Sequence, residues 1–508
     1  MDKTEKMTAS RRTVIGGMGA LAAALAAPQA LAQDAKRPNM VFFLGEGLRN
    51  DAFDFLGGLA KTPNMTRIAM EGAHFTNAFC TNALCLPSRA SFLTGCYPHT
   101  NGAVTNDEAV VLPQYKLVSD LLKEAGYDTA FIGKSHVGGA LRDHDWDYYF
   151  GFNGQANYLH PKITEGSHGK YGPETEYSGY VDDLLTDKAV EYIDKRTSDK
   201  PFILFLWFYA PHAPFYRARR FETHFIGDDV AVPSTFNEDM TGYAGKPRAV
   251  ANADNKIGST MIADDDPRSV EELVKDYYAG VASNDEDVGR IMDSLRRKNV
   301  YDDTLLMLSS DHGFFLGEHH MYDKRLMYEP SIRIPMMVSY PKGIKAGTIR
   351  NEMVLNIDVA QTLLEFAGIT APSTMQGASF KPLCENKTVA NWRKDWLYEY
   401  FEYPGYENVR PARGVRTERW KYINYFLAPE EFELYDLQND PTEAHNLYGM
   451  PGFEQITETL RNRLEELRRE TGDHYHWKPA RVPKITHQMV PPAETFVDTT
   501  SKWYGGTK

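Results

Sequence analysis

The stretch Met40–Gly47 reads MVFFLGEG, in which five apolar residues run without interruption into a glycine, a glutamate and a second glycine. Three later stretches have the same design, an apolar run that stops abruptly at a small or charged residue: residues 129–132, 202–209 and 304–308. Short apolar runs without alternation are typical of strands that are buried on both faces, as in a parallel sheet. We therefore expect these runs to be strands of a buried, mostly parallel sheet.

Helical periodicity separates these predicted strands. Residues 115–126 place Leu117, Val118, Leu121 and Leu122 on one stripe and end in a glycine, and similar patterns occupy residues 269–298 and 358–367. Strands that alternate with helices predict an α/β fold, with a large central, mostly parallel sheet sandwiched between helices.

Polar side chains follow all of the predicted strands directly after their carboxyl ends. These side chains are Glu46, Lys134 with His136, His212, and Asp311 with His312. In open α/β sheets, ligands bind beyond the carboxyl ends of the strands. The sequence therefore predicts one cleft that binds a polyanion or a metal.

The pattern of predicted secondary structure changes after about residue 381. Short strands separated by turns are predicted at residues 395–402, 414–417, 420–425 and 433–437, followed by an amphipathic helix at 453–469. We expect a catalytic domain at residues 33–380 and a smaller C-terminal α+β domain with a short antiparallel sheet at 381–508.

The first 32 residues have the features of an export signal. Arg11 and Arg12 precede a mildly apolar, alanine-rich stretch that ends in Ala30-Leu31-Ala32, as in a twin-arginine signal peptide. No later stretch has the apolar length of a membrane span. We expect a periplasmic or secreted protein that uses the twin-arginine export machinery as a partner.

Composition narrows the class of substrate. The 508 residues carry a formal charge of −13, whereas a nucleic-acid-binding surface needs an excess of basic residues. We therefore expect no nucleic-acid partner. The four cysteines include no Cys-x-x-Cys pair, and we expect at most one disulfide.

One of these cysteines lies in LCLPSRASFLTG, Leu84–Gly95. Pro87 favours the first turn of a helix, which puts Cys85 at the helix N-terminus, where backbone N–H groups favour anions. Arg89, one turn later, points back to the same site. An electropositive pocket of this kind is typical of reactive cysteines.

Cys85, Pro87, Ser88, Arg89, Thr94 and Gly95 match the signature C-x-P-S-R-x-x-x-x-T-G. With it, the chain resembles the type I sulfatases of the alkaline-phosphatase superfamily. Further matching stretches, including GCYPHTNG, GKSH, APHAPF and SSDHGFFLGEHHMYDK, extend the resemblance over nearly the whole mature chain. The resemblance implies an alkaline-phosphatase-like fold and a sulfuric-ester hydrolase. It also implies that a maturase converts Cys85 to Cα-formylglycine, whose hydrate supplies the nucleophilic oxygen.

The resemblance assigns the remaining roles. Arg89 stabilises the hydrate, Lys134 and Lys324 hold sulfate oxygens, and His136 removes the second proton of the hydrate. His212 binds the ester oxygen and protonates the leaving group. Glu46, Asp311 and His312 bind one divalent cation, usually calcium in this family. His99, His319 and His320 have no assigned role, and we expect them to be structural.

The first metal-binding segment departs from the family pattern. Sulfatases usually have two adjacent aspartates after the first strand, whereas this chain has Glu46 and Gly47. Gly47 has no ligand to offer, so we expect weaker metal binding, with Glu46 the least secure ligand.

The leading substrate class is a sulfated carbohydrate, because the segment YEYFEYPGYENVRPARGVRTERWKYI is similar to that of the N-acetylglucosamine-6-sulfatase type. Tyr406, Asn408, Arg410 and Arg413 are candidates for sugar contacts or for simple surface solvation. Two alternatives stay open. One is a phosphonate monoester or phosphodiester hydrolase of the same superfamily, which also lacks the second aspartate. The other is a pseudoenzyme that binds sulfated glycans without cleaving them.

Overall fold

Strand β1 (Asn39–Gly45) lies inside an 11-stranded sheet in a computed structural model that describes residues 37–106, 111–137, 141, 144–238, 245–257 and 267–480. The predicted signal, residues 1–32, lies outside these ranges. Beside β1 run β10 (Thr304–Ser310) and β9 (Phe202–Trp207), followed by β4 (Asp128–Lys134) and β5 (Tyr148–Phe152), all parallel. These strands include all four predicted apolar runs.

The edges of the sheet are mixed. Beyond β10 lie β13 (Met336–Ser339), β2 (Ala73–Phe75) and β14 (Thr348–Arg350), and beyond β5 lie β6 (Lys162–Ser167), β7 (Lys170–Tyr171) and β8 (Thr175–Glu176). The pairs β10–β13, β13–β2 and β5–β6 are antiparallel. The sheet is therefore parallel at its centre, where crossover helices bury both faces, and mixed toward its edges, where β14 again pairs with β2 in parallel.

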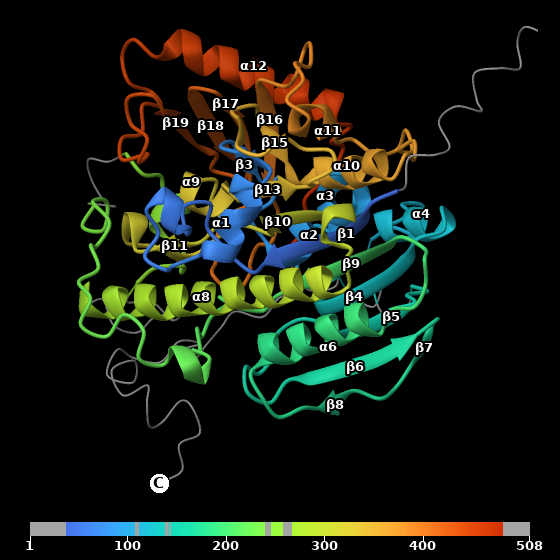
Figure 1. Cartoon of the computed structure of the whole chain (residues 1–508). Helices are drawn as coiled ribbons and strands as arrows, with labels where there is room; N and C mark the ends of the chain where they lie inside the picture. Colours follow the sequence, from blue (N-terminus) through green and yellow to red (C-terminus); the bar gives the residue numbers. More distant parts are fainter. Residues whose placement is uncertain are drawn as a thin grey trace, which may run out of the picture. The chain divides into compact units, whose positions relative to one another are not determined.

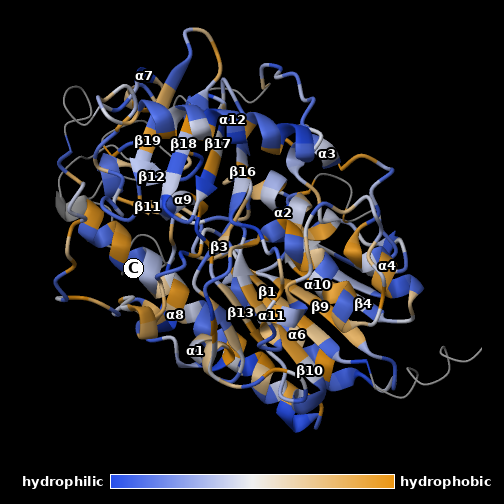
Figure 2. Cartoon of the chain, turned by 90° about the horizontal axis from the view of Figure 1, so that it is seen from above, coloured by the Kyte–Doolittle hydropathy of each residue, from blue (hydrophilic) through white to orange (hydrophobic). Residues whose placement is uncertain are grey.

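Alternate residues of β1 enter two different cores. Met40, Phe42 and Leu44 pack with α2 (Cys85–Thr94), α4 (Val118–Glu124) and α10 (Val359–Phe366). Val41 and Phe43 pack with α1 (Pro63–Met70), α6 (Val181–Lys195) and α8 (Pro267–Arg297). Figure 1 shows the helices on both sides of the sheet, and Figure 2 shows apolar residues gathered along its strands. The predicted α/β sandwich is confirmed.

A second sheet occupies the C-terminal region. Strands β16 (Asp395–Tyr400), β17 (Ala412–Thr417), β18 (Trp420–Tyr425) and β19 (Glu431–Asp436) form an antiparallel meander covered by α12 (Glu454–Glu470). The expected short antiparallel sheet is thus present (Figure 1). Leu397, Val415, Ile423 and Leu434 join the same core as α2 and α10. Because the described residues from Pro38 onward form one compact unit, the boundary at residue 380 stays a prediction.

Strand register places the predicted polar residues at one edge of the sheet. Gly45 pairs with Ser310, and Trp207 pairs with both Leu44 and Gly133. The residues that follow these pairs therefore leave the sheet side by side. This edge carries the candidate site.

Shorter elements and loops complete the described chain. They are α3 (Pro98–Asn101), α7 (Arg248–Ala251), α9 (Glu329–Ile332), α11 (Lys381–Cys384), β3 (Ala78–Phe79), β11 (Phe315–Leu316), β12 (Tyr322–Asp323) and β15 (Val354–Leu355). None of the helices in the described ranges combines the length and apolarity needed to cross a membrane. All four cysteines are buried and free, so they form no disulfide.

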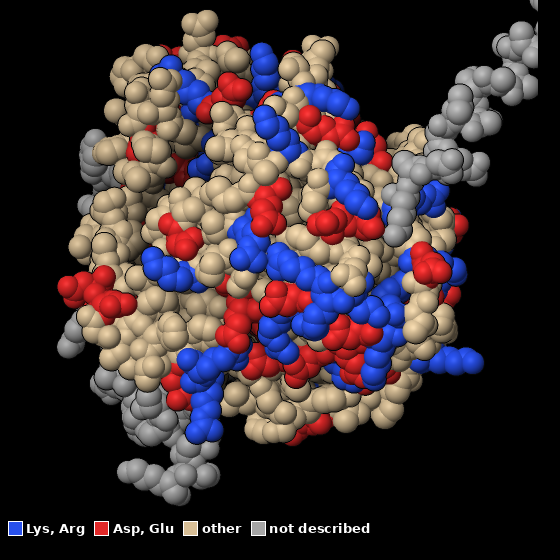
Figure 3. Space-filling model, viewed as in Figure 1, with Lys and Arg blue, Asp and Glu red and all other residues tan. Residues whose placement is uncertain are grey.

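The surface over α6 and α8 carries charges of both signs. Figure 3 shows lysines and arginines mixed with acidic residues on this face. Ion pairs join the two helices, as between Arg290 and Asp187 and between Arg297 and Asp194. The face therefore carries no extended patch of a single sign.

Candidate active site

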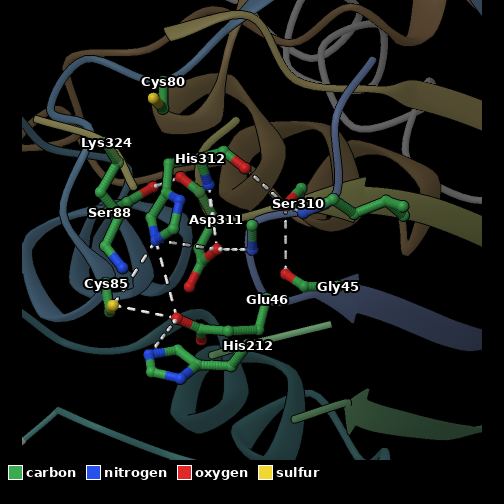
Figure 4. Close-up of polar contacts among 12 residues, drawn as sticks. Gly45, Glu46, Cys80, Cys85, Ser88, His212, Ser310, Asp311, His312 and Lys324 are labelled. Carbon is green, nitrogen blue, oxygen red and sulfur yellow. Dashed lines mark hydrogen bonds and ion pairs between the residues drawn. The ribbon is translucent and has the colours of Figure 1, made fainter. Parts of the chain in front are cut away.

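Cys85 is the first residue of α2, and its side chain points into the edge of the sheet described above. Leu84 caps the helix in an extended conformation, and Pro87 lies in the first turn, as the sequence predicts. The Cys85 Sγ donates to Glu46 Oε1 at 3.0 Å and lies 3.5 Å from His312 Nε2 (Figure 4). The thiol is therefore fully buried against residues that follow β1 and β10.

Arg89 bridges the two carboxylates of the site. Its guanidinium donates to Glu46 Oε2 at 2.5 Å, to Asp311 Oδ2 at 2.9 Å and to the Lys134 carbonyl at 2.6 Å. Lys134 Nζ lies 3.0 Å from the same Glu46 oxygen. These contacts orient both carboxylates and leave Glu46 Oε1 facing Cys85.

Gly47 contributes its backbone to the site. Its N–H and that of His312 both donate to Asp311 Oδ1 at 3.0 Å. Gly47 has a left-handed φ of +68°, which glycine adopts without strain. A Cβ there would lie 3.1 Å from the Phe314 ring, tighter than ordinary packing. Gly47 has no side chain that could bind a metal, but its backbone N–H holds the Asp311 carboxylate in place.

Glu46, Cys85, Asp311 and His312 form a possible metal site. One ligand atom from each lies within 4.8 Å of all the others. His312 Nδ1 is bonded to the Gly313 carbonyl at 2.8 Å, so Nε2 faces the cluster. Histidine ligands of metals are commonly oriented by this kind of contact. Two carboxylates and an imidazole fit a divalent cation.

The pKa values of the two carboxyl groups, Glu46 and Asp311, are shifted in opposite directions. Burial raises the pKa of Glu46, but Lys134 and Arg89 outweigh it and hold the pKa well below its usual range. Burial and the Glu46 charge raise the pKa of Asp311 to about 6. Burial also opposes ionisation of Cys85, yet Lys324 and Lys134 hold the pKa of the thiol well below its usual value. The pocket therefore favours an anion at position 85.

His136 and His212 approach position 85 from the loops after β4 and β9. Both imidazoles hydrogen-bond to the Cys85 side chain. The exposed fraction is 8% for His136 and 7% for His212. His212 Nδ1 is bonded to the Ala213 carbonyl at 2.6 Å, which leaves Nε2 toward Glu46. Burial is the main cause that lowers the pKa of both imidazoles, so both are neutral near pH 7.

Lys324 completes the set from the loop after β12. Its Nζ lies 2.9 Å from Asp323 Oδ1, and Figure 4 shows the side chain extending toward Cys85. The structure thus brings together all the residues predicted for the site, although they come from five separate stretches of sequence.

Some site residues were not assigned a role from the sequence. Ser88 Oγ donates to the Asp311 carbonyl at 2.5 Å and accepts from Asn356 Nδ2 at 2.9 Å. Ser88 belongs to the signature, so its position was a usable signal. Asn356 precedes a predicted helix and carries no signal that separates it from a surface asparagine.

The histidines expected to be structural have partners in the protein. His99 pairs with Glu399 at 2.6 Å, and His319 pairs with Glu238 at 2.5 Å. His320 contacts the Phe236 carbonyl at 3.2 Å.

Two of the candidate sugar contacts are also paired internally. Arg413 binds Asp473, and Arg410 binds Glu431. Both guanidinium groups are therefore held by carboxylates of the C-terminal region.

Comparison with known proteins identifies the family. A model described as Sulfatase matches residues 38–369, and a model described as N-sulphoglucosamine sulphohydrolase, C-terminal, matches residues 317–470. The chain belongs to the sulfatase family. The resemblance of the Cys85 signature is thereby confirmed, and the protein is a sulfuric-ester hydrolase.

Two of the named relatives are N-acetylglucosamine-6-sulfatases. An N-acetylglucosamine-6-O-sulfatase of Bacteroides thetaiotaomicron is 34% identical over 87% of this chain and 88% of the relative. An N-acetylglucosamine-6-sulfatase of Capra hircus is 27% identical over 82% and 81%. A structure solved in complex with its substrate, D-glucosamine-2-N,6-O-disulfate, is 32% identical, covers 86% of this chain and 99% of that chain, and has a TM-score of 0.80.

Proposed function

We propose that this sulfatase removes sulfate from a sulfated carbohydrate, and specifically from a 6-O-sulfated, N-substituted glucosamine. The substrate named for the relative from Bacteroides thetaiotaomicron and the disulfated glucosamine bound in the solved complex support this class. The observation that carries the proposal is the convergence on Cys85 of two lysines, two neutral histidines and a carboxylate–imidazole cluster. These groups suit a tetrahedral anion attached to a neutral leaving group.

Cys85 acts as a precursor in this proposal. Its Sγ marks the position that the formylglycine oxygens would take after a maturase has oxidised the side chain. Glu46 Oε1, 3.0 Å from Sγ, and the His136 imidazole, which hydrogen-bonds to the Cys85 side chain, support a role for these two groups in contacting such an oxygen. His136, as a neutral imidazole, accepts a proton there, which lets the aldehyde return once sulfate leaves.

The lysines and His212 act on the ester. Lys134 and Lys324 bind sulfate oxygens as point charges, while Arg89 keeps Glu46 and Asp311 in position. His212 presents Nε2 to the ester oxygen and donates a proton to the departing alcohol. This step needs a proton on a histidine whose pKa burial lowers, and the negative charge of the incoming sulfate ester raises the proton affinity of that nitrogen.

Glu46, Asp311 and His312 would hold one divalent cation. When bound, it supplies charge that polarises the sulfate and lowers the pKa of a neighbouring hydroxyl. Calcium is the ion that the family resemblance implies. The imidazole also suits manganese, and elemental analysis of the purified protein distinguishes the two.

The sulfatase reaches an exported compartment through residues 1–32 in this proposal. The paired Arg11 and Arg12 support a twin-arginine route, which carries folded proteins. The partners are then the export machinery and a formylglycine-generating maturase.

One preparation tests the whole proposal. Mass spectrometry of the Cys85 peptide from the native host should show the formylglycine mass. Matched sulfate and phosphonate esters should then be hydrolysed with a clear preference for sulfate, highest for the 6-sulfate of N-acetylglucosamine. A preference for the phosphonate would establish the phosphodiesterase-type alternative. Tight glycan binding without turnover by formylglycine-containing protein would establish the pseudoenzyme.

A further inference from the structure

Lys324 is held by a buried cluster that the reaction itself does not use. Its Nζ contacts Asp323 at 2.9 Å, and its carbonyl accepts from Asn255 Nδ2 at 3.1 Å. Only 3% of Lys324 is exposed. The direction of the ammonium group therefore depends on what holds Asp323.

Arg325 holds Asp323 together with a residue of the C-terminal region. Its Nη1 lies 2.5 Å from Asp323 Oδ2 and 2.5 Å from Glu407 Oε2. Glu402 Oε1 lies 4.0 Å from Arg325 Nε. All of these side chains are buried. The loop after β12 and the segment between β16 and β17 therefore share one charge cluster.

The charges of this cluster balance only if one carboxyl group is neutral. Lys324 and Arg325 supply two positive charges, whereas Asp323, Glu402 and Glu407 supply three negative charges when all are ionised. A buried charge without a partner is strongly destabilising, so a proton on one carboxyl is favoured. Glu407 is the best site for it, because its Oε1 faces no donor among the described residues, whereas Glu402 also accepts from the Asn106 N–H at 2.7 Å.

The pKa directions agree with this geometry. Burial, and next the charge of Asp323, raise the pKa of Glu407 well above its usual value against the opposing effect of Arg325. Burial also acts to raise the pKa of Asp323, but Lys324 and Arg325 outweigh it and hold that pKa well below its usual range. A hydrogen bond links the two carboxyl groups, with Glu407 as the protonated donor.

We propose that Glu407 is a positioning residue, whose neutral carboxyl completes the Asp323–Arg325 pair and thereby aims Lys324 at the sulfate. The proposal rests on the role given above to Lys324. It assigns the C-terminal region a part in the reaction, because Glu407 and Glu402 of that region contact Arg325, which follows Lys324 in the sulfate-binding loop.

Because of this cluster, the affinity for sulfate should fall at alkaline pH. A raised pKa means that Glu407 is neutral at low and neutral pH and ionises as the pH rises through its folded value. The new charge then competes for Arg325 and Lys324. The titratable and charged groups that face Glu407 are Tyr322, Asp323, Lys324 and Arg325 from one segment, and Tyr400 and Glu402 from the other.

The test compares Glu407→Gln with Glu407→Leu in the full, matured enzyme. Glutamine keeps a neutral donor, so kcat/KM should stay within about twofold of wild type at neutral pH. Because glutamine does not ionise, kcat/KM of this variant should also fall less at alkaline pH than kcat/KM of the wild type. Leucine removes the donor, so kcat/KM and the affinity for inorganic sulfate should each fall about tenfold. The melting temperature of each variant is measured alongside.

Two control variants distinguish a wrong role for Lys324 from a wrong positioning role for Glu407. Glu433→Gln alters another buried carboxyl, which accepts from Tyr328, Tyr425 and Tyr435, and should leave the pH profile unchanged. Lys324→Ala should lower sulfate affinity at least as much as Glu407→Leu; if it has no effect, the role of Lys324 in the proposed function is wrong. If Lys324→Ala is severe but both Glu407 variants bind sulfate like wild type, only the positioning role is wrong. Equal losses in the two Glu407 variants would also overturn it.

Discussion

The two halves of the active site are built differently. Glu46, Asp311 and His312 follow strands of the central sheet, are almost completely buried and are bound by Arg89 or by backbone groups. His136 and Lys324 come from loops, and His136 adopts a left-handed backbone conformation. The strand half is therefore held by the sheet itself, whereas the loop half depends on contacts made outside it.

This difference matches the two tasks of a sulfatase. A cation and a nucleophile need fixed geometry, which parallel strands provide because their ends leave the sheet in register. A substrate must enter and leave, and three of the residues proposed to contact it, His136, His212 and Lys324, are slightly exposed and carried on loops. Changes in the strand half should therefore abolish chemistry, and changes in the loop half should alter how the ester is handled.

The largest effect is expected for Cys85→Ala, which removes the proposed precursor of the nucleophile. We expect kcat to fall by about 10⁴-fold or more, as for other nucleophile deletions. Cys96→Ala changes another buried free cysteine and should keep activity within about twofold of wild type. Substantial turnover by the Cys85 variant would contradict the role of this residue.

Asp311→Asn should remove one charge from the proposed metal site and the carboxylate partner of Arg89. We expect kcat to fall by about 10³-fold, because a cation held there would stabilise charge in the transition state, and the metal content should fall in elemental analysis. Asp358→Asn is the matched control, since Asp358 is a buried aspartate paired with Arg393. Addition of a chelator to wild-type enzyme should reproduce the loss; full activity in its presence would refute a metal requirement.

In the loop half, His212→Ala should lower kcat/KM by about 10²-fold, the lower end for loss of a general acid. The loss should be larger for a sugar ester than for a 4-nitrophenyl ester, whose leaving group needs no proton. His320→Gln provides the control outside the site. An equal loss on both esters would mean that His212 binds substrate without protonating it.

Gly47→Ala should destabilise the strand half. The left-handed backbone and the contact with Phe314 should together cost about 2 kcal/mol of the free energy of unfolding. Gly57→Ala has a similar positive φ of +94° but no atom within 4 Å, and should cost only about 1 kcal/mol. Chemical denaturation measures both, and equal costs would mean that the Phe314 contact is unimportant.

The smallest effect is expected away from the site, at His99. Burial lowers its pKa, but Glu399 raises it more, so the net pKa is raised and the pair stabilises the fold at low pH. This contribution is complete below the unfolded pKa and is lost as the pH rises through the folded pKa. His99→Gln should cost about 1.5 kcal/mol at pH 6 and less at pH 9, with kcat unchanged. A cost independent of pH would contradict this.

The strand half was predictable from sequence because its signals are local. Each apolar run ends where its functional residue begins, and Cys85, Ser88 and Arg89 share one helix. The loop half was harder to predict. Lys134, His136 and His212 do follow predicted strands, and Lys324 was recognised through a motif. Asp323 and Glu407 were not recognised, although Tyr406 and Asn408 on either side of Glu407 were considered as sugar contacts.

The amino-acid sequence by itself determined the strands, the helix that begins at Cys85, the family and the chemical types that meet in the site. These follow from hydrophobic periodicity and from residue types at fixed spacing. Only the tertiary structure decided that the Gly47 N–H binds Asp311, 264 residues away, and that three carboxyl groups surround Arg325. Strand register and buried charge balance depend on which distant segments pack together, and no local pattern encodes that choice.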